Sequence, residues 1–468
     1  MASNGVHASL SRPHLALVAF PFGTHAAPLF TLASAIAAAA PDVLLSFIST
    51  AQSLASLPSS KELLGNLRLV PIPDGMTKGP EAQPAMREPE KIAMFLATMP
   101  GGLQAGLDAA VAAAGGAAVS CVVSDAFLWM AGEVAEAAGA PWVALSTGGT
   151  ASLSAHIHTD LLRGNFGVDE QAIPRQDELI HFIPALSAYR VRDLPEGVVI
   201  GDIDTPFSCC LHRMGQSLRK AAAVLLHTFH GLDPVIDAEL EANFTNPLPI
   251  GPLHLLSPPV VPAPDTNCCL PWLDHHAAAT VVYVSFGSVM TPPPPELAEL
   301  AQGLEASGAA FLWSLKDKAR ELLSPGFLDR TKERGLVVSW APQLDVLRHA
   351  AVGAFVTHCG WNSVLEAMTG TVPMVCRPFF GDQRLNERSV SLIWKIGVGF
   401  EGGTITKEGM VKALEVVLKS EEGKRMRAKA GELKAMAVRA VEPEGNSRIN
   451  FKKLLELIGN MPRHDVAH

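Results

Sequence analysis

Short apolar runs alternate with longer segments of helical periodicity along most of this chain. In the first half the apolar runs cover residues 14–20, 43–48, 67–72, 120–123 and 142–145. In the second half they cover residues 280–286, 310–315, 336–339, 352–357 and 372–376, with a helical pattern at about 295–307. Short, nearly continuous apolar runs are typical of strands buried on both faces. Their alternation with helices predicts two doubly wound α/β domains of Rossmann-like type, each with a parallel sheet between helices.

One uncharged segment near the start could be mistaken for a signal or membrane helix. Residues 15–41 contain no Asp, Glu, Lys or Arg, which is long enough for such a segment. Pro21, Gly23 and Pro28 interrupt it, so a buried strand, a loop and an alanine-rich helix are a better interpretation. We therefore expect no membrane span.

A proline-rich segment separates the two alternations. Residues 246–265 read NPLPIGPLHLLSPPVVPAPD and contain seven prolines in twenty positions. Because proline fixes φ and removes a backbone donor, this segment forms neither a continuous helix nor a central strand. We interpret it as an interdomain linker, with domains at residues 1–245 and 266–446.

Composition narrows the classes of function. The 468 residues suffice for two domains, and 48% hydrophobic with 18% charged residues indicates a globular protein. The net charge of −9 argues against nucleic acid as a partner, since no basic surplus can neutralise phosphates. Seven cysteines include the adjacent pairs Cys209-Cys210 and Cys268-Cys269 without C-x-x-C metal spacing. We interpret them as reduced structural thiols of a cytoplasmic protein.

The most informative stretch runs from Trp340 to Gln383: WAPQLDVLRHAAVGAFVTHCGWNSVLEAMTGTVPMVCRPFFGDQ. Its apolar run 352–357 leads through His358-Cys359-Gly360 into a predicted helix. Unpaired N–H groups and the helix dipole make such a helix start an anion site. Trp340 offers an aromatic face for a base, and Asp382 with Gln383 offers groups that bind hydroxyls. The stretch therefore provides for a nucleobase, phosphates and a sugar.

This stretch resembles the donor-binding signature of plant family 1 UDP-sugar glycosyltransferases through its W-A-P-Q, H-C-G-W-N-S, E, G-x-V-P and D-Q elements. The resemblance continues in AFPFGTHAAP, DAFLW, RDLPEGVV, LHRMGQ and RPFFGDQR, and is closest to flavonoid (anthocyanidin and flavonol) 3-O-glucosyltransferases. It implies the GT-B architecture, in which two Rossmann-like domains face a cleft, the first binding the acceptor and the second the UDP-sugar. It also implies that a C-terminal helix, within residues 447–468, packs back on the first domain.

The resemblance assigns roles in donor binding. Trp340 would stack on uracil, the Ala341 backbone would bond the base edge, and Gln343 and Glu366 would bind the ribose. The diphosphate would face Ser288, His358, Asn362 and Ser363, and the sugar would face Asp382, Gln383, Thr147 and the backbone of Trp361. Two interpretations from the residues alone stay open. Trp340 could be a core tryptophan at a strand end, and Ser363 with Glu366 fits a capping box.

A histidine and an aspartate follow apolar runs in the first half. His25 lies in the loop after run 14–20, and Asp125 follows run 120–123, at strand ends where such folds expose functional groups. A carboxylate beside so apolar a run must be solvated or paired, which suggests a base oriented by an acid. By resemblance, His25 deprotonates the acceptor and Asp125 orients it. The alternative is Asp125 as a helix cap before residues 127–138.

The expected reaction is an inverting, metal-independent transfer of glucose from UDP-glucose, as co-substrate and without a cofactor, to a flavonoid 3-hydroxyl by a monomer. By resemblance the acceptor site comprises Thr24, Phe127, His156, Phe207 and Phe380, whose aromatic walls suit flat acceptors. Three positions depart from the family: Pro89 and Pro195 replace glutamines of some members, and Ser146 replaces a more usual tryptophan. UDP-galactose, UDP-rhamnose and other phenolic acceptors therefore stay open.

Two rival classes remain. A metal-dependent transferase would use Asp202-Ile203-Asp204 as a D-x-D clamp on manganese. A non-enzymatic nucleotide-sugar-binding protein would have no need of His25 and Asp125. A Ser-His-Asp hydrolase is disfavoured, because the sequence lacks a G-x-S-x-G elbow.

Overall fold

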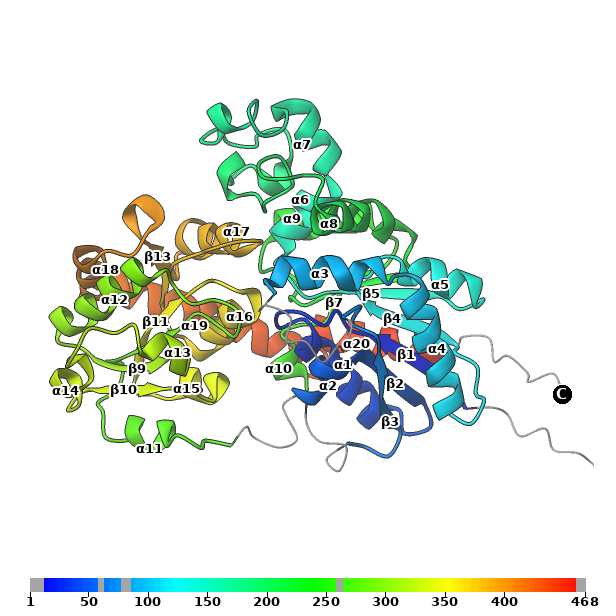
Figure 1. Ribbon diagram of the computed structural model, residues 1–468, viewed down its shortest axis with the longest axis horizontal. Helices are drawn as coiled ribbons and strands as arrows, with labels where there is room; N and C mark the ends of the chain where they lie inside the picture. The colour runs from blue at the N-terminus through cyan, green and yellow to red at the C-terminus, as the bar shows by residue number, and fades with distance from the viewer. Residues whose placement is uncertain (1–11, 58–62, 77–85, 258–263, 460–468) are drawn as a thin grey trace, which may run out of the picture.

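The computed structural model describes residues 12–57, 63–76, 86–257 and 264–459. Figure 1 shows two α/β domains beside each other, the first drawn in blue to green and the second in yellow-green to orange. Each domain is built on one parallel sheet with helices on both faces. The two doubly wound domains predicted from the sequence are confirmed.

The first sheet has seven parallel strands in the order β3-β2-β1-β4-β5-β6-β7. They are β1 (His14–Val18), β2 (Leu44–Thr50), β3 (Leu67–Ile72), β4 (Cys121–Asp125), β5 (Trp142–Ser146), β6 (Ala223–Leu226) and β7 (Pro247–Pro249). The first five match predicted runs to within a few residues, whereas β6 and β7 were not predicted. The strand order reverses between β1 and β4, and ligands bind at the carboxyl ends of strands at such a switch point.

Helices cover both faces of this sheet, which follows from the period-two alternation of its strands. Leu15 and Leu17 share a core with α1 and α10, whereas Ala16 and Val18 share the opposite core with α4 and α5. The helices of the domain are α1 (Ala26–Ala39), α2 (Ala51–Ala55), α3 (Glu88–Ala97), α4 (Gly101–Ala113), α5 (Ala131–Ala137), α6 (Thr150–Ile157), α7 (Thr159–Phe166), α8 (Pro206–Ser217), α9 (Pro234–Asn243) and α10 (Leu253–Leu256).

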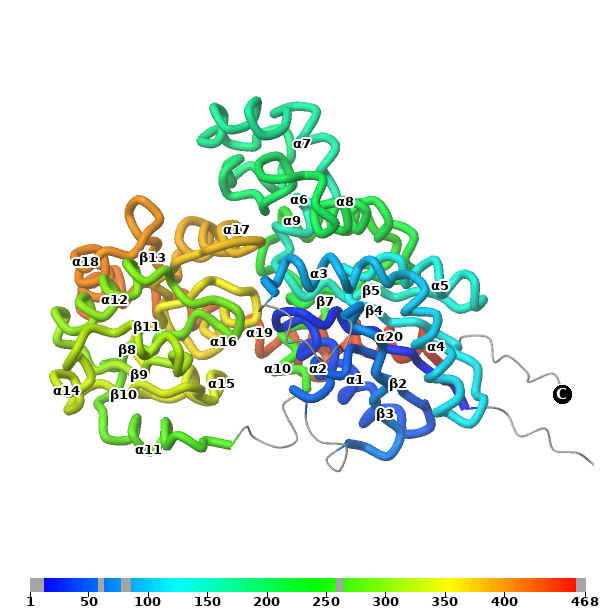
Figure 2. Tube along the Cα trace, in the orientation of Figure 1, coloured from blue at the N-terminus to red at the C-terminus, as the bar shows by residue number. Residues whose placement is uncertain are grey.

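Between α6 and α8 the chain leaves the sheet layers. Residues 159–200 form α7 and a series of short turns, and α7 stands above both sheets at the top of Figure 1 and of the tube view in Figure 2. This segment is called the α7 excursion below.

The second sheet has six parallel strands in the order β10-β9-β8-β11-β12-β13. They are β8 (Val281–Ser285), β9 (Ala310–Ser314), β10 (Gly335–Val338), β11 (Val352–Thr357), β12 (Met374–Cys376) and β13 (Gly397–Gly399). The helices are α11 (Cys269–Leu273), α12 (Pro294–Ser307), α13 (Asp317–Arg320), α14 (Phe327–Thr331), α15 (Gln343–Arg348), α16 (Trp361–Gly370), α17 (Gln383–Arg388), α18 (Lys407–Lys419) and α19 (Glu421–Val441). The switch point of this sheet lies between β8 and β11, so β11 delivers the loop 358–360 to it.

The predicted linker 246–265 is wrong in its first half. Its residues 247–249 are β7, which pairs with β6 at the edge of the first sheet. An edge strand tolerates proline because one side of it needs no backbone donor. Leu253 and Leu256 of α10 then enter the core beneath α1, and residues 258–263 lie outside the described residues.

The last described helix, α20 (Asn446–Gly459), packs on the first domain. Its Phe451, Leu454 and Ile458 join the core that α1 and α10 cover. The chain therefore returns from the second domain to the first. None of the helices in the described ranges combines the length and apolar character needed to cross a bilayer.

Candidate active site

The loop after β1 and the end of β4 bring His25 and Asp125 together. His25 Nδ1 lies 2.8 Å from Asp125 Oδ2, although the two residues come from separate parts of the sequence. Asp125 Oδ1 accepts a hydrogen bond from Phe127 N (2.9 Å). The cap alternative for Asp125 is wrong, because α5 begins only at Ala131 with Met130 as its N-cap. One carboxylate oxygen supports the loop and the other orients the imidazole.

The surroundings of His25 are largely apolar and acidic. Its ring centroid lies 4.4 Å from that of Phe127 and 5.3 Å from that of Phe20. Burial alone would lower the pKa of His25, but the carboxylates of Asp125 and Asp382 outweigh it and raise this pKa above its usual value. Because Nδ1 faces Asp125, Nε2 is the ring nitrogen left to exchange a proton with a ligand.

Thr147, which directly follows β5, is also part of this group. Its Oγ1 lies 2.9 Å from His25 Nδ1. Thr147 is predicted from the sequence to bind the sugar, and its contact with His25 is an additional finding. The carboxyl ends of β1, β4 and β5 thus meet in one polar cluster.

The loop between β11 and α16 has polar atoms without protein partners. The His358 ring lies between two glycines: a Cβ on Gly287 would come within 2.9 Å of it and one on Gly360 within 2.5 Å. Burial lowers the pKa of His358 to about 4, so its ring is neutral near pH 7. Among the described residues, His358 Nδ1 and Asn362 Oδ1 are buried without a hydrogen-bond partner. Buried polar groups are normally satisfied, so these atoms point to a ligand.

Gln343, Ser363 and Glu366 form a second cluster beside this loop. Gln343 Nε2 donates to Ser363 Oγ (2.9 Å) and to Glu366 Oε2 (2.7 Å). The capping-box alternative is wrong, because the N-cap of α16 is Gly360 and Ser363 already lies within the helix. Burial raises the pKa of Glu366 to about 7. An acceptor-rich carboxyl of this kind suits a ligand that brings hydroxyl donors.

Trp340 is exposed. Its exposed fraction is 46%, so the alternative of a core tryptophan is wrong. Asn267 Nδ2 donates a hydrogen bond to the carbonyl oxygen of Trp340 (2.8 Å). Ala341, the next residue, is buried. Ser288, in the loop after β8, is exposed as well. An indole face is therefore open to a flat ring.

Asp382 and Gln383 lie at the start of α17. Asp382 Oδ2 accepts from Gly149 N of the first domain (3.1 Å) and from Asn386 Nδ2 (2.9 Å). Gln383 Oε1 accepts from Phe379 N (2.9 Å), which leaves its amide nitrogen for other partners. Burial raises the pKa of Asp382.

Asn386 and Gly149 were missed by the sequence analysis. Asn386 Nδ2 also donates to Cys359 O (3.0 Å), which ties Asp382 to the β11–α16 loop. Its spacing of four residues from Asp382 on one helix is the only sequence signal of this contact. Gly149 contributes only its backbone N–H, so the sequence gives no side-chain signal of this contact.

The two domains meet at this site. Trp361 Nε1 donates to His227 O (2.7 Å), and Asn362 Nδ2 lies 3.5 Å from Thr24 Oγ1. Thr24 therefore lies at the boundary between the two domains. Ligands bound between His25 and Asp382 would touch both domains.

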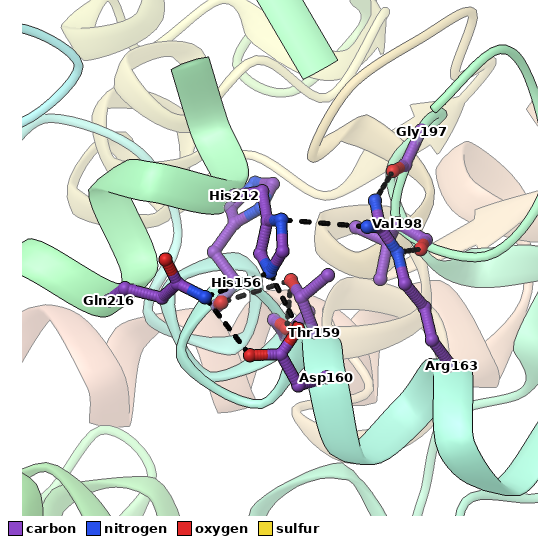
Figure 3. Close-up of polar contacts among 9 residues, drawn as sticks. His156, Thr159, Asp160, Arg163, Gly197, Val198, His212 and Gln216 are labelled. Atoms are coloured by element: carbon purple, nitrogen blue, oxygen red, sulfur yellow. Dashed lines mark hydrogen bonds and ion pairs between the residues drawn. The ribbon is translucent and has the colours of Figure 1, made fainter. Parts of the chain in front are cut away.

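An aromatic cluster lies beside His25. Phe127 and Phe207 have centroids 5.7 Å apart, and Phe127 lies 5.4 Å from Phe20. Phe380 is 42% exposed and makes no ring contact with this cluster within the described chain. His156 on α6 is buried, and burial lowers its pKa to about 4. Its Nδ1 has no partner among the described residues, and Figure 3 shows it next to His212 of α8.

The aspartates of the predicted D-x-D clamp form a local turn. Asp202 Oδ1 accepts from Asp204 N (3.0 Å) just before α8. Within the described ranges no three His, Cys, Asp or Glu side chains group in a way that could hold a metal ion.

Comparisons with known proteins agree with this geometry. A family model described as UDP-glucoronosyl and UDP-glucosyl transferase matches residues 29–430. The chain is 51% identical over 453 residues to a myricetin 3-O-rhamnosyltransferase of Crocosmia x crocosmiiflora, with 96% of this chain and 98% of that protein covered. It is 51% identical over 464 residues to an anthocyanidin 3-O-glucosyltransferase of Zea mays, with 95% and 97% covered. A crystal structure of a UDP-glucose: anthocyanidin 3-O-glucosyltransferase in complex with UDP matches with a TM-score of 0.89 at 38% identity, covering 96% of this chain and 99% of that one.

Proposed function

Because this chain belongs to the UDP-glucoronosyl and UDP-glucosyl transferase family, we propose that it transfers glucose from UDP-glucose to the 3-hydroxyl of a flavonol or anthocyanidin. The chain is a UDP-glycosyltransferase with the GT-B architecture. The observation that carries the proposal is the meeting of the two domains, where Gly149 N bonds Asp382 (3.1 Å) and Asp382 raises the pKa of His25. The residues proposed to activate the acceptor therefore lie next to those proposed to bind the sugar.

The donor would lie along the second domain. Uracil stacks on the exposed Trp340 and bonds the Ala341 backbone, and the ribose hydroxyls bond Glu366 and Gln343. The unpartnered His358 and Asn362, with Ser363 and Ser288, take the diphosphate at the start of α16. Asp382, Gln383, Thr147 and the Trp361 backbone bind the sugar.

The acceptor would lie against the aromatic cluster. A flat phenolic ring system packs on Phe127 and Phe207, with Phe380 closing the exposed side and His156 and Thr24 at the polar edge. Neutral His156 can donate or accept one hydrogen bond without placing a charge beside an apolar ligand.

The chemistry follows from His25 and Asp125. His25 Nε2 takes the proton of the acceptor hydroxyl, and the oxygen forms a bond to the anomeric carbon. The bond from that carbon to the β-phosphate oxygen breaks, and UDP leaves with the electron pair. Asp125 stabilises the imidazolium that forms. A single displacement of this kind, through an oxocarbenium-like state, inverts the anomeric configuration.

The choice of sugar rests on Asp382 and Gln383. The two relatives above are equally identical to this chain, yet one is named a rhamnosyltransferase and the other a glucosyltransferase. A carboxylate can accept from two vicinal equatorial hydroxyls, and an axial 4-hydroxyl would leave one group poorly paired, at about 1–3 kcal/mol. This cost corresponds to a roughly 5- to 150-fold preference for UDP-glucose over UDP-galactose in kcat/KM. UDP-rhamnose is the second candidate, because one of these relatives is named a rhamnosyltransferase and Ser146 stands where the family more usually has a tryptophan.

One competition experiment tests the proposal. UDP-glucose, UDP-galactose and UDP-rhamnose are offered at equal concentration with one flavonol, and the products are identified by NMR. We expect the β-linked 3-O-glucoside as the main product, with undiminished activity in excess chelator. A galactoside or rhamnoside as the main product would contradict the choice of glucose. Activity lost in chelator and restored by manganese would favour the D-x-D alternative.

A further inference from the structure

A contact between the domains lies outside the residues that bind the donor. Glu196 is on the α7 excursion, and its Oε2 accepts a hydrogen bond from Gly381 N (2.8 Å). Its Oε1 accepts from Arg384 Nη1 (2.6 Å), and Arg384 Nη2 donates to Phe379 O (3.3 Å). We call Glu196, Gly381 and Arg384 the latch. It bonds both ends of the segment 379–381, which immediately precedes Asp382 and Gln383.

The first-domain side of the latch is held firmly. Arg163 of α7 donates from Nε to Val198 O and from Nη2 to Gly197 O, both at 2.8 Å, as Figure 3 shows. Gly197 has a φ of +82°, and a Cβ there would lie 2.2 Å from Ser208 Oγ, so only glycine fits. Glu196 therefore extends from an anchored turn.

A second set of contacts holds α7 itself. Asp160 of α7 accepts from Gln216 Nε2 (3.1 Å) and lies 2.7 Å from His212 Nε2, and both partners are on α8 (Figure 3). The helix that carries Arg163 is thereby fixed to the body of the first domain. The latch connects this fixed part of the first domain to Gly381 and Arg384 of the second domain.

An open pocket adjoins the latch. A cavity of about 460 Å³ is lined by Asp193, Leu194 and Glu196 from the first domain and by Arg377, Arg384 and Glu387 from the second. Within the second domain, the segment 379–381 is held by Gln383 Oε1, which accepts from Phe379 N (2.9 Å) and Phe380 N (3.3 Å), and by the packing of Phe379 against Phe286. Among the described residues, the hydrogen bond that this segment makes to the first domain is the one from Gly381 N to Glu196.

We propose that Glu196 is a positioning residue for the donor sugar, and this inference rests on the proposed roles of Asp382 and Gln383. The latch holds the segment 379–381 in the shape that aims these two side chains at the sugar. The Arg384 and Glu196 side chains are 38% and 45% exposed, and an exposed ion pair alone contributes little. The bond from Gly381 N to a carboxylate is charge-assisted and carries the larger effect.

The test separates sugar binding from nucleotide binding. In Glu196→Ala, the Kd of UDP-glucose measured by calorimetry without acceptor should rise about 5- to 10-fold, the net scale of one typical hydrogen bond at a partly exposed site. The Kd of UDP should change less than twofold, because UDP lacks the transferred sugar that Asp382 and Gln383 are proposed to bind. Glu196→Gln keeps an acceptor for Gly381 N and should lose less. Arg384→Ala should act in the same direction, and the double variant should lose less than the sum of the two.

A matched control comes from the same excursion. Glu178 forms an exposed pair with Arg175 through two hydrogen bonds (3.0 and 2.8 Å) that does not reach the second domain. Glu178→Ala removes the same charge and should leave both Kd values unchanged. Melting temperatures of all variants should stay close to that of the parent, because Tyr189 and Ser389 still join the domains by a buried hydrogen bond (2.8 Å).

Two results would overturn the inference: an unchanged Kd of UDP-glucose in Glu196→Ala, or parallel losses for UDP and UDP-glucose. Either one, found in an enzyme that still glucosylates flavonols, would leave the proposed function intact. A parent protein that binds neither nucleotide would overturn both proposals.

Discussion

Asp382 accepts a hydrogen bond from Gly149 N, across the boundary between the two domains and 233 residues away in the sequence. The bond joins the loop after β5, beside His25, to the start of α17. This bond fixes the residues proposed to activate the acceptor at a set position relative to those proposed to bind the sugar. Proximity of this kind supplies much of the rate enhancement of a two-substrate transfer.

Replacing Gly149 should disturb this relative position of the two groups of residues. A Cβ at position 149 would lie 2.3 Å from Asn386 Oδ1, a buried side chain with no free space. Gly149→Ala should therefore lower the melting temperature and reduce kcat/KM by about tenfold or more. Gly164→Ala is the control, because nothing lies within 4 Å of its Cβ and alanine favours the helix α7. Equal behaviour of the two variants would contradict the prediction.

His25 and Asp125 predict a pH dependence. His25→Ala should lower kcat by about 10²-fold or more, as the loss of a general base does, with UDP affinity nearly unchanged. The base must be neutral, so activity should fall as the pH drops through the pKa of His25, which the carboxylates raise above 6.5. Asp125→Asn removes the larger of these carboxylate effects and should move the acid limb of kcat/KM to lower pH, besides lowering kcat.

Glu366→Gln should separate affinity from stability. The variant should weaken UDP-glucose binding by about 1.5–3 kcal/mol, the scale of a hydrogen bond to a charged group. Burial raises the pKa of Glu366 from 4.5 to about 7. The folded protein therefore favours the protonated form, and stability from this group is present below pH 4.5 and lost as the pH rises through 7. At pH 8 the melting temperature of the variant should equal or exceed that of the parent.

Removing Asn386 should affect Asp382, the carboxylate that is proposed to bind the sugar. Asn386 is buried and donates to both Asp382 Oδ2 and Cys359 O. Asn386→Ala leaves two buried acceptors with one partner fewer, which costs about 1–3 kcal/mol each. We expect a lower melting temperature and a higher KM for UDP-glucose. A normal KM with a lower melting temperature would limit Asn386 to a structural role.

The sequence by itself determined the local architecture. Apolar runs identified the central strands of both sheets, because strands buried on both faces must be apolar wherever they occur. The stretch from Trp340 to Gln383 predicts a base, phosphate and sugar site, because a strand, a loop and a helix start lie in one continuous segment. His25 and Asp125 were found as side chains at strand ends, where doubly wound folds expose function.

Only the tertiary structure decided the contacts that join distant segments. β7 reads as part of a proline-rich linker, and its pairing with β6 gives it a place in the first sheet. Ser363 and Glu366 have the spacing of a capping box, but the helix begins at Gly360 and Gln343 bonds both of them. Gly149 and Gly381 act through backbone N–H groups, which every residue except proline possesses. Such contacts depend on where the chain returns in space, and no local pattern of residues records that position.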